Sequence, residues 1–426
     1  METINTVTNV IITVITAMAM YKIIYGLIGF FGKEKKFPTA KKLRSFGIIV
    51  CARDESAVIG NLLDSIEKQS YPKELIKVFA VADNCSDNTA DICRAHGAAV
   101  YERFDKTKKR KGYAMGFLFE NIKRDYGIDA LDAYVVFDAD NVLAPNYLTE
   151  INKALDTGCD IALGYRNTKN FDENIISSAY GIHFLRASAL THRPRAKLGF
   201  STHIAGTGYA IRSEVLLDGW KHFSLTEDTE FTITSFSNGK KAMFCEAAEF
   251  YDEQPHSIGI MIRQRLRWEK GRLACFFRYI GRLFTGASKN KLNPISTYDM
   301  FMYFFPKSLF IAFLSLIYPV AQIFAGIFNP ATFIHLPLTL LTSIGTMYLG
   351  CLFYGAVTVI RERRRIKCST GKLILYTLAF PWFDLTGLPI AIASLFIKVK
   401  WKRIRHDRDI KIDELVDTTE KETAHA

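Results

Sequence analysis

Two carboxylates that stand two positions apart, Asp138 and Asp140, follow the apolar run of residues 133–137. The valines at its centre and its continuous apolar character are typical of a strand buried on both faces. Ligands of open α/β sheets bind at the carboxyl ends of the strands, where these acids would lie. Two carboxylates this close repel each other unless a cation lies between them or they share a proton. This stretch alone leaves two alternatives open, a cation site or turn residues after a core strand.

Short apolar runs and helical stretches alternate from residue 45 to residue 165. The runs at 46–50, 78–81, 98–101, 133–137 and 161–164 are expected to be strands. Glu55 comes soon after the first run and Asp83 soon after the second, so acids follow three of the strands. Strict alternation predicts a Rossmann-like α/β domain, in which a parallel sheet carries helices on both faces. The acids would then gather at one sheet edge.

The composition points to a chain with separate polar and apolar parts. Hydrophobic residues make up 49% of the 426 residues, although 55 Lys and Arg and 43 Asp and Glu give a net charge of +12. The basic residues concentrate near the apolar segments, which favours a cytoplasmic membrane surface or phosphate ligands over a nucleic-acid groove. The eight cysteines are scattered without a CxxC pair, so neither a disulfide framework nor a zinc site is expected.

Four apolar segments are long enough to span a membrane. Residues 7–31 precede a Lys-rich cluster, which predicts an anchor with an outside N-terminus and not a cleaved signal peptide. Further spans are expected at 301–324, 336–360 and 373–397. Pro381 and other helix-breaking or charged residues interrupt the last of these, so a broken or re-entrant element is an alternative. The side on which the basic tail lies stays open.

Two short motifs stand where the alternation stops. Gly206-Thr207-Gly208 could let the backbone approach a ligand closely, or could be a plain turn before a helix near Glu214. Thr226-Glu227-Asp228 could cap a helix, or could present Asp228 as a catalytic base at a helix start.

A basic amphipathic helix is expected over residues 256–284, lying in the membrane interface. Gln264, Arg267 and Trp268 face roughly together on it, because residues three and four apart share a helix face. Gly271 is expected to interrupt the helix just after them.

In order and spacing, these motifs resemble the membrane-embedded processive glycosyltransferases of family 2, which include cellulose, chitin, hyaluronan and poly-N-acetylglucosamine synthases. The matching residues are Ala52-Arg53-Asp54-Glu55, Asp83, Asp138-Ala139-Asp140, Gly206-Thr207-Gly208, Thr226-Glu227-Asp228 and Gln264-Arg265-Leu266-Arg267-Trp268. The resemblance covers 46–271 and the flanking membrane layout. It implies a cytoplasmic GT-A-type domain at 45–255, between an anchor at 1–32 and interface helices at 256–297. Transmembrane segments at 298–400 and a polar tail at 401–426 follow.

The resemblance also implies roles for individual residues in a UDP-sugar-dependent, inverting hexosyltransferase. Asp228 would be the catalytic base, and Asp140 would ligate Mg²⁺ or Mn²⁺. Donor-binding residues would be Ala52, Arg53, Glu55, Asp83, Lys111, Asp138, Gln264 and Arg267, although a solvated basic loop is the alternative at Lys111. Acceptor-binding residues would be Gly206, Thr207, Gly208, Glu227 and Trp268.

The implied enzyme is a multi-pass protein of the plasma membrane. Its partners would be a UDP-sugar, a growing polysaccharide and the lipid bilayer, with a homo-oligomer or an export partner and no nucleic acid. Two alternatives stay open, transfer of one sugar to a polyprenyl phosphate or other lipid, and a non-catalytic transport or scaffold protein. Asn84 stands where many relatives have a second acid, and an FxVTxK segment is missing, which weakens cellulose as the product.

Overall fold

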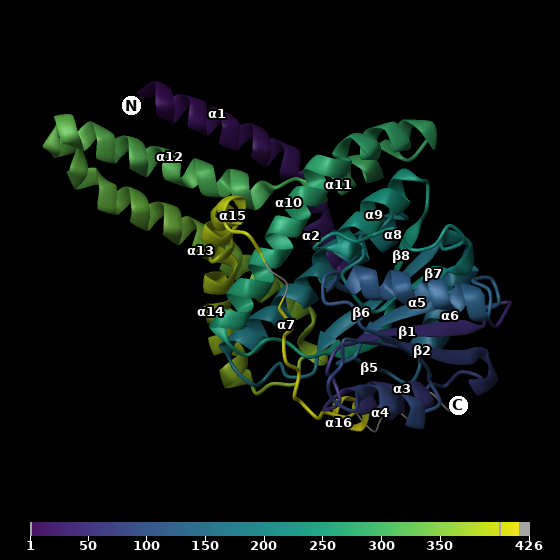
Figure 1. Ribbon diagram of the computed structural model, residues 1–426. Helices are drawn as coiled ribbons and strands as arrows, with labels where there is room; N and C mark the ends of the chain where they lie inside the picture. The colour runs from purple at the N-terminus through teal and green to yellow at the C-terminus, as the bar shows by residue number, and fades with distance from the viewer. Residues whose placement is uncertain (1, 400–401, 417–426) are drawn as a thin grey trace.

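An eight-stranded mixed sheet lies at the centre of the computed structural model, which describes residues 2–399 and 402–416 (Figure 1). The strand order is β3-β2-β1-β4-β7-β6-β8-β5. The strands are β1 (Phe46–Ala52), β2 (Ile76–Asp83), β3 (Ala99–Arg103), β4 (Ala133–Asp138), β5 (Val142–Leu143), β6 (Ile161–Thr168), β7 (Tyr209–Arg212) and β8 (Ala242–Asp252). All five predicted strands are present, and the expected α/β GT-A-like fold is confirmed.

The sheet differs from the expected one in its second half. Strands β1 to β4 run parallel, whereas β7 pairs antiparallel with both β4 and β6. The sequence prediction missed β5, β7 and β8. Two of them are only two and four residues long, too short to show a periodicity. The sequence left open a plain turn before a helix near Glu214; in the structure β7 comes between that turn and a single 3₁₀ turn at Ser213–Val215.

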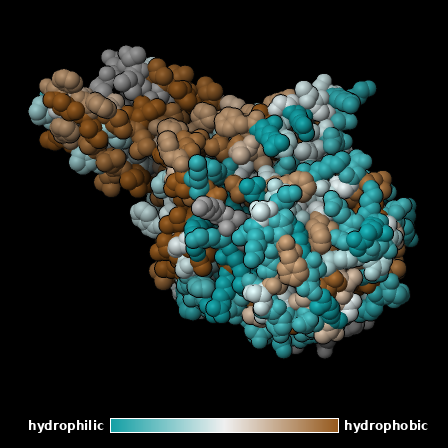
Figure 2. Space-filling view, in the orientation of Figure 1, coloured by the Kyte–Doolittle hydropathy of each residue, from teal (hydrophilic) through white to brown (hydrophobic). Residues whose placement is uncertain are grey.

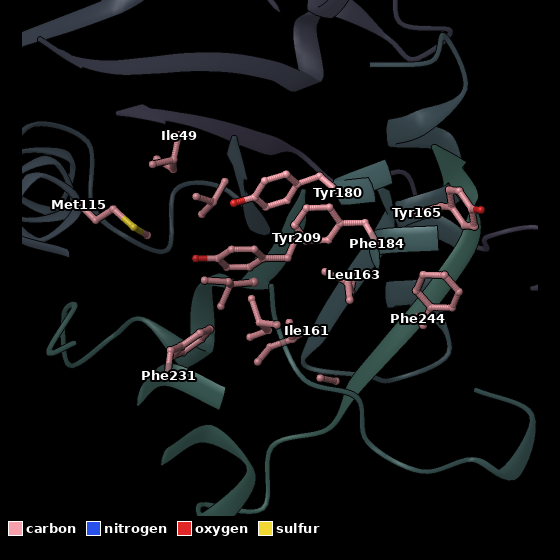
Figure 3. Close-up of a cluster of buried hydrophobic side chains, with 14 of the residues drawn as sticks. Ile49, Met115, Ile161, Leu163, Tyr165, Tyr180, Phe184, Tyr209, Phe231 and Phe244 are labelled. Carbon is pink, nitrogen blue, oxygen red and sulfur yellow. The ribbon is translucent and has the colours of Figure 1, made fainter. Parts of the chain in front are cut away.

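Helices cover both faces of the sheet, so alternate strand residues enter two separate cores. In β1, Ile48 and Val50 pack with residues of α3 (Ile59–Glu67) and α6 (Tyr147–Asp156), whereas Ile49 joins the opposite core with α5 (Lys111–Asp125). Figure 3 shows Tyr180 and Phe184 of α7 (Ile175–Ala187) in that second core, near Tyr209 and Leu163. Burial on both faces explains why β1 and β4 are continuously apolar.

An arm of apolar helices projects from the α/β domain (Figures 1 and 2). It consists of α1 (Glu2–Ala19), α12 (Lys307–Phe328) and α13 (Leu336–Arg361). Within the described residues, three helical stretches are long and apolar enough to cross a membrane: Lys307–Phe328, Phe333–Arg361 and Thr370–Phe396. Many large apolar side chains on these stretches are exposed, which suits a lipid environment and not water.

The N-terminal segment is not one continuous helix. It breaks at Met20 and bends by 42° between α1 and α2 (Tyr21–Phe31), so that the pair makes a fourth candidate span only when counted together. At the break, the Tyr21 hydroxyl and the Lys22 amine both donate to Asp299 of α11 (Pro294–Phe304). The polar residues within the predicted anchor therefore tie it to the rest of the protein.

Both ends of the last apolar segment return to the α/β domain. The segment divides at Thr386 into α14 (Thr370–Leu385) and α15 (Gly387–Phe396). Ahead of α14, Glu362 pairs with buried Arg193 of α8 (Arg193–Leu198) at 2.6 Å. After α15, residues 402–416 run back over the α/β domain and end in the short helix α16 (Ile412–Leu415). We call residues 402–416 the C-terminal strap. The strap therefore packs against the α/β domain.

Three further helices complete the description: α4 (Thr89–Ala95), α9 (Glu227–Ser237) and α10 (Ile258–Lys289). The amphipathic helix expected over 256–284 is confirmed as α10. Gly271 does not interrupt it, because the helix continues for eighteen residues beyond that glycine to Lys289.

Candidate active site

Asp138 at the end of β4 is held by a glycine-rich loop and by a lysine. The Lys111 amine, at the start of α5, lies 2.5 Å from Asp138 Oδ1 and 2.9 Å from the Gly206 carbonyl oxygen. The Asp138 backbone N–H donates to the Thr207 hydroxyl at 3.0 Å. The solvated loop considered for Lys111 is wrong, because its side chain is largely buried and paired with Asp138. The three segments therefore meet at one sheet edge.

The glycines of this loop have backbone conformations that suit glycine. Gly206 and Gly208 have φ of +80° and +67°, in the left-handed region. A Cβ at Gly208 would lie 2.0 Å from the Phe250 ring, so no larger residue fits. The Thr207 hydroxyl is buried and donates to Asn141, while it accepts from Asp138. In this structure Thr207 holds Asp138 in place, and an acceptor contact for the loop stays a prediction.

Asp140 lies deeper in the same edge, at 5% exposure. Its carboxylate accepts the Glu253 backbone N–H at 3.1 Å. Burial acts to raise its pKa, but the charges of His406 and Lys169 outweigh burial and lower the pKa of Asp140 below its usual value. An ionised, buried carboxylate beside a second one is a donor set that suits Mg²⁺ or Mn²⁺, with phosphate oxygens completing the coordination.

A second candidate metal cluster lies nearby. Among the described residues, Asp54, Cys85 and Asp87 form a cluster whose possible ligand atoms all lie within 4.8 Å of one another. Their polar atoms already have protein partners. The Asp54 N–H donates to the Cys85 sulfur, Asp87 accepts from Thr89, and Arg403 pairs with Asp54. Because a thiol is a poor ligand for hard cations, Asp140 fits Mg²⁺ or Mn²⁺ better.

The acids at the start of α9 face the same region. A Cβ built on Gly206 would lie 3.7 Å from Asp228 Oδ2, so the base candidate lies beside the loop that touches Lys111. Burial raises the pKa of Asp228, and burial together with the Asp228 charge raises the pKa of Glu227 to about 7. Thr226 makes no side-chain cap, so the capping alternative is wrong for that residue.

Helix α10 brings the Gln-x-x-Arg-Trp residues against α9. The Arg267 guanidinium donates to the Leu225 carbonyl at 3.0 Å, and its charge lowers the pKa of Asp228 against the effect of burial. A Cβ at Gly271 would lie 2.5 Å from the Thr226 side chain, so the glycine lets the two helices approach. Trp268 packs edge to face against Tyr180. The buried Gln264 Oε1 has no hydrogen-bond partner among the described residues.

The predicted nucleotide pocket lies at the ends of β1 and β2. Asp83 is 4% exposed and pairs with two arginines, Arg53 and Arg103, the latter at 2.7 Å. Ala52 is buried, and the Glu55 carboxylate lies 3.2 Å from His406 Nδ1. These residues do meet at one edge. Their contacts with a nucleotide stay a prediction.

Four residues of the site were not predicted: Arg166, Lys169, Glu253 and His406. Arg166 pairs with Asp252, whose pKa is raised to about 6 by burial against the effect of Arg166. Asp252 ends β8, as Asp138 ends β4, and Glu253 follows directly, so the same pattern of acids at a strand end could have indicated them. Lys169 and His406 had no such signal, because only the folded chain brings them to Asp140.

The comparisons with known proteins agree with this geometry. Residues 44–271, more than half of the chain, match the family model "Glycosyltransferase like family 2". The chain is 24% identical over 382 residues to the "Probable glycosyltransferase YdaM" of Bacillus subtilis (strain 168), covering 86% of each chain. It is similar to the fold of the mannosyltransferase PcManGT from Pyrobaculum calidifontis, solved with GDP-Man and Mn²⁺, at 16% identity and a TM-score of 0.53. That likeness covers 90% of this chain and 98% of PcManGT.

Two further relatives are named as synthases of different products. The beta-monoglucosyldiacylglycerol synthase of Trichormus variabilis is 24% identical, over 60% of this chain and 54% of its own length. The poly-beta-1,6-N-acetyl-D-glucosamine synthase of Staphylococcus aureus (strain COL) is 23% identical, over 60% of this chain and 62% of its own length. The chain thus spans somewhat over half the length of each of these two relatives. Taken with the family match over 44–271, these relatives show that the chain belongs to glycosyltransferase family 2 and is an enzyme that uses a nucleotide sugar.

Proposed function

We propose that the protein transfers a sugar from a UDP-sugar, with inversion and with a divalent cation, to the end of a growing β-linked polysaccharide at a membrane. One connected set of contacts carries the proposal: Asp228 lies beside Gly206, whose carbonyl binds Lys111, whose amine binds Asp138. The base candidate and the acids of the donor side therefore lie within one continuous site. This is the arrangement that a single displacement requires.

Asp228 would accept the proton of the acceptor hydroxyl as its oxygen attacks the anomeric carbon. The bond from that carbon to the diphosphate oxygen breaks on the opposite face, and UDP leaves with the electron pair. A raised pKa for Asp228 suits this role, because a carboxyl with an ordinary pKa is too weak a base near neutral pH. Asp140, with Asp138 beside it, would hold Mg²⁺ or Mn²⁺, which offsets the charge that develops on the diphosphate.

The relatives include both a beta-monoglucosyldiacylglycerol synthase and a poly-beta-1,6-N-acetyl-D-glucosamine synthase, so two kinds of acceptor are considered for this chain. Trp268, with Tyr180 against its edge, offers an aromatic surface on which a sugar ring could stack. This surface supports a glycan acceptor. The second candidate, a polyprenyl-phosphate or other lipid acceptor, is supported by the contacts of α10 with α15, which in turn contacts α12 of the apolar arm.

The layout supports a multi-pass protein of the plasma membrane with the α/β domain in the cytoplasm. The basic residues before β1 and between α13 and α14 flank apolar helices on the side of the α/β domain, as the positive-inside rule expects. The layout also supports the division of the chain predicted from the sequence: an anchor, the GT-A domain, interface helices, membrane segments and a tail. Part of the predicted tail, residues 401 and 417–426, lies outside the described residues.

The test is to incubate the purified chain with labelled UDP-glucose, UDP-N-acetylglucosamine, UDP-glucuronate or UDP-galactose and size the product. A polymer that grows with time supports the proposal, whereas one sugar on a lipid establishes the second candidate. Asp228→Asn should stop sugar transfer while UDP still binds. Unchanged turnover in that variant would remove Asp228 from the mechanism, and the absence of any transfer in the wild type would favour a transport or scaffold role.

A further inference from the structure

The C-terminal strap crosses the sheet edge at which the donor residues meet. The Arg403 guanidinium pairs with Asp54, with Nη1 at 3.3 Å from Oδ2. His406 Nδ1 lies 3.2 Å from Glu55 Oε2. The backbone N–H groups of the next two strap residues donate to the two carboxylate oxygens of Glu253, at 3.3 and 3.1 Å. The strap therefore spans from the end of β1 to the end of β8, around Asp140.

An apolar anchor holds the strap in this position. Ile412 and Leu415 of α16 are buried against Val142 and Tyr251, in a cluster separate from the two main cores. Full burial of such side chains contributes about 1.5–3 kcal/mol each. Polar contacts add to it, because Asn61 donates to Asp409 at 2.8 Å. Side chains of the strap itself therefore hold it against the α/β domain.

Two cationic side chains, Lys169 near the strap and Arg403 within it, each have a buried donor atom without a hydrogen-bond partner among the described residues. Lys169 is 6% exposed, and its buried Nζ has no hydrogen-bond partner among the described residues. Arg403 Nε is also buried and has no hydrogen-bond partner within the described part of the chain. A buried donor without a partner costs about 1–3 kcal/mol. An anionic ligand would accept hydrogen bonds from these donors and so offset that free-energy cost.

The position of Lys169 connects it to the acids of the site. Its charge acts on Asp140, as does that of His406, and these two are the leading cations around that carboxylate. Lys169 also lines a cavity of about 480 Å³ whose wall includes Arg408 and Leu415 of the strap. The Lys169 backbone N–H donates to the Asp252 carbonyl at 2.9 Å. The next residue, Glu253, donates its N–H to Asp140 and accepts from the strap, so one short segment links Lys169, the acid that we assign to the metal, and the strap.

We propose that the docked strap is part of the donor site, and that Lys169 and His406 bind the diphosphate of a nucleotide donor beside Asp140. The inference rests on the proposed function in one respect, that the donor is a nucleoside diphosphate sugar. It adds two binding residues and a segment more than a hundred residues beyond the family match. Strap and donor are expected to bind together, each stabilising the other.

The experiment compares binding of UDP, which carries the diphosphate, with binding of uridine, which does not. Calorimetry on the purified full chain gives the UDP affinity, and competition gives that of uridine. Because hydrogen bonds to charged groups contribute about 1.5–3 kcal/mol, His406→Ala and Lys169→Met should each weaken UDP about 10- to 100-fold. Uridine binding should not change. Leu415→Asp, which releases the anchor, should weaken UDP to a similar extent.

Arg405→Ala is the matched control, since its side chain lies on the same strap, one residue from His406, and is 81% exposed. It should bind UDP as the wild type does. Unchanged UDP affinity in His406→Ala and Lys169→Met would overturn the inference, and so would tighter binding, which would mean that the strap competes with the donor. Loss of uridine binding in parallel would assign only a structural role. A wild type that binds neither UDP nor GDP would instead overturn the proposed function.

Discussion

The Lys111 amine lies 2.5 Å from Asp138 Oδ1 and 2.9 Å from the Gly206 carbonyl oxygen, so one cation joins the end of β4 to the loop before β7. Burial acts to lower the pKa of Lys111, but the Asp138 charge outweighs it and the pKa is raised. Lys111 therefore stays charged at neutral pH. It neutralises the first acid of the pair, which leaves Asp140 as the acid that we assign to the metal ion.

Lys111→Met is expected to lower sugar transfer about 10- to 100-fold, because a buried charge-assisted hydrogen bond contributes about 1.5–3 kcal/mol. The variant removes both the partner of Asp138 and the contact that fixes the Gly206 carbonyl. UDP release with the preferred donor measures the effect. Lys109→Met, on an exposed residue of the preceding loop, is the control and should keep wild-type turnover. Full activity in Lys111→Met would remove this cation from the site.

The acid limb of the pH profile should report the pair at the start of α9. Burial raises the pKa of Glu227 to about 7 and also raises that of Asp228. A base must be deprotonated to accept a proton, so kcat/KM should fall as the pH drops through the raised pKa of Asp228 and should level off above it. Glu227→Gln removes a negative charge beside Asp228 and should move this limb to lower pH. A profile that is flat between pH 5 and 8 in the wild type would contradict the assignment.

The sequence predicts the parts of the site that follow from local patterns. Asp138 and Asp140 could be placed because a continuous apolar run marks a buried strand, and ligands bind where such strands end. His406 could not, because it stands 351 residues from Glu55 and nothing near it in the sequence indicates a ligand. Burial and the pairing of charges across the chain decide its position, and neither leaves a local pattern.

Gly271 is a second residue whose role local sequence patterns do not predict. Helix propensity alone suggests that a glycine interrupts a helix, since it costs about 1 kcal/mol relative to alanine. In the structure the helix continues, and the missing side chain serves the packing of α10 on Thr226. Tertiary contact thus overrides local propensity. A sequence pattern identifies such a glycine but does not say which of the two effects prevails.

Gly271→Ala should therefore lower kcat more strongly than it lowers the free energy of unfolding. The new methyl group would lie 2.5 Å from the Thr226 side chain, and overpacking of this kind costs about 1–3 kcal/mol and shifts the backbone. Glu227 and Asp228 follow Thr226 directly, so the shift should reduce kcat about 10-fold or more, as misplacement of catalytic groups does. The control is Gly281→Ala in the same helix, where a Cβ meets nothing within 4 Å. It should raise the free energy of unfolding slightly and keep kcat.

Removal of the metal tests which site binds it, Asp138 and Asp140 or the Asp54–Cys85–Asp87 cluster. Excess chelator should abolish sugar transfer, and added Mn²⁺ should restore it. Asp140→Asn should require a much higher Mn²⁺ concentration, because it removes the buried ionised ligand. Asp87→Asn, in the Asp54–Cys85–Asp87 cluster, should leave the Mn²⁺ requirement unchanged. The reverse result, with Asp87→Asn sensitive and Asp140→Asn normal, would move the metal to the second cluster. Activity that persists in chelator would contradict both.

The last prediction concerns α14 and α15, which the layout suggests enter the membrane and return on the same side. Both flanks bind the α/β domain: Asn167 donates to the Arg365 carbonyl before α14, and Asn61 donates to Asp409 after α15. A segment that crosses the membrane once would place these flanks on opposite sides. The test labels single cysteines with an impermeant maleimide, after the four half-buried native cysteines, Cys51, Cys85, Cys351 and Cys368, are changed to serine.

Cysteines at Arg364 and Arg405, one on each flank, should both react from the side of the α/β domain, in inverted vesicles. A cysteine at Asn329, between α12 and α13, should react only from the other side, since α12 and α13 form the two arms of a hairpin away from that domain. Labelling of Arg364→Cys and Arg405→Cys from opposite sides would make α14–α15 a full span. The strap could then not reach Glu55, because a bilayer about 30 Å thick would separate it from the α/β domain.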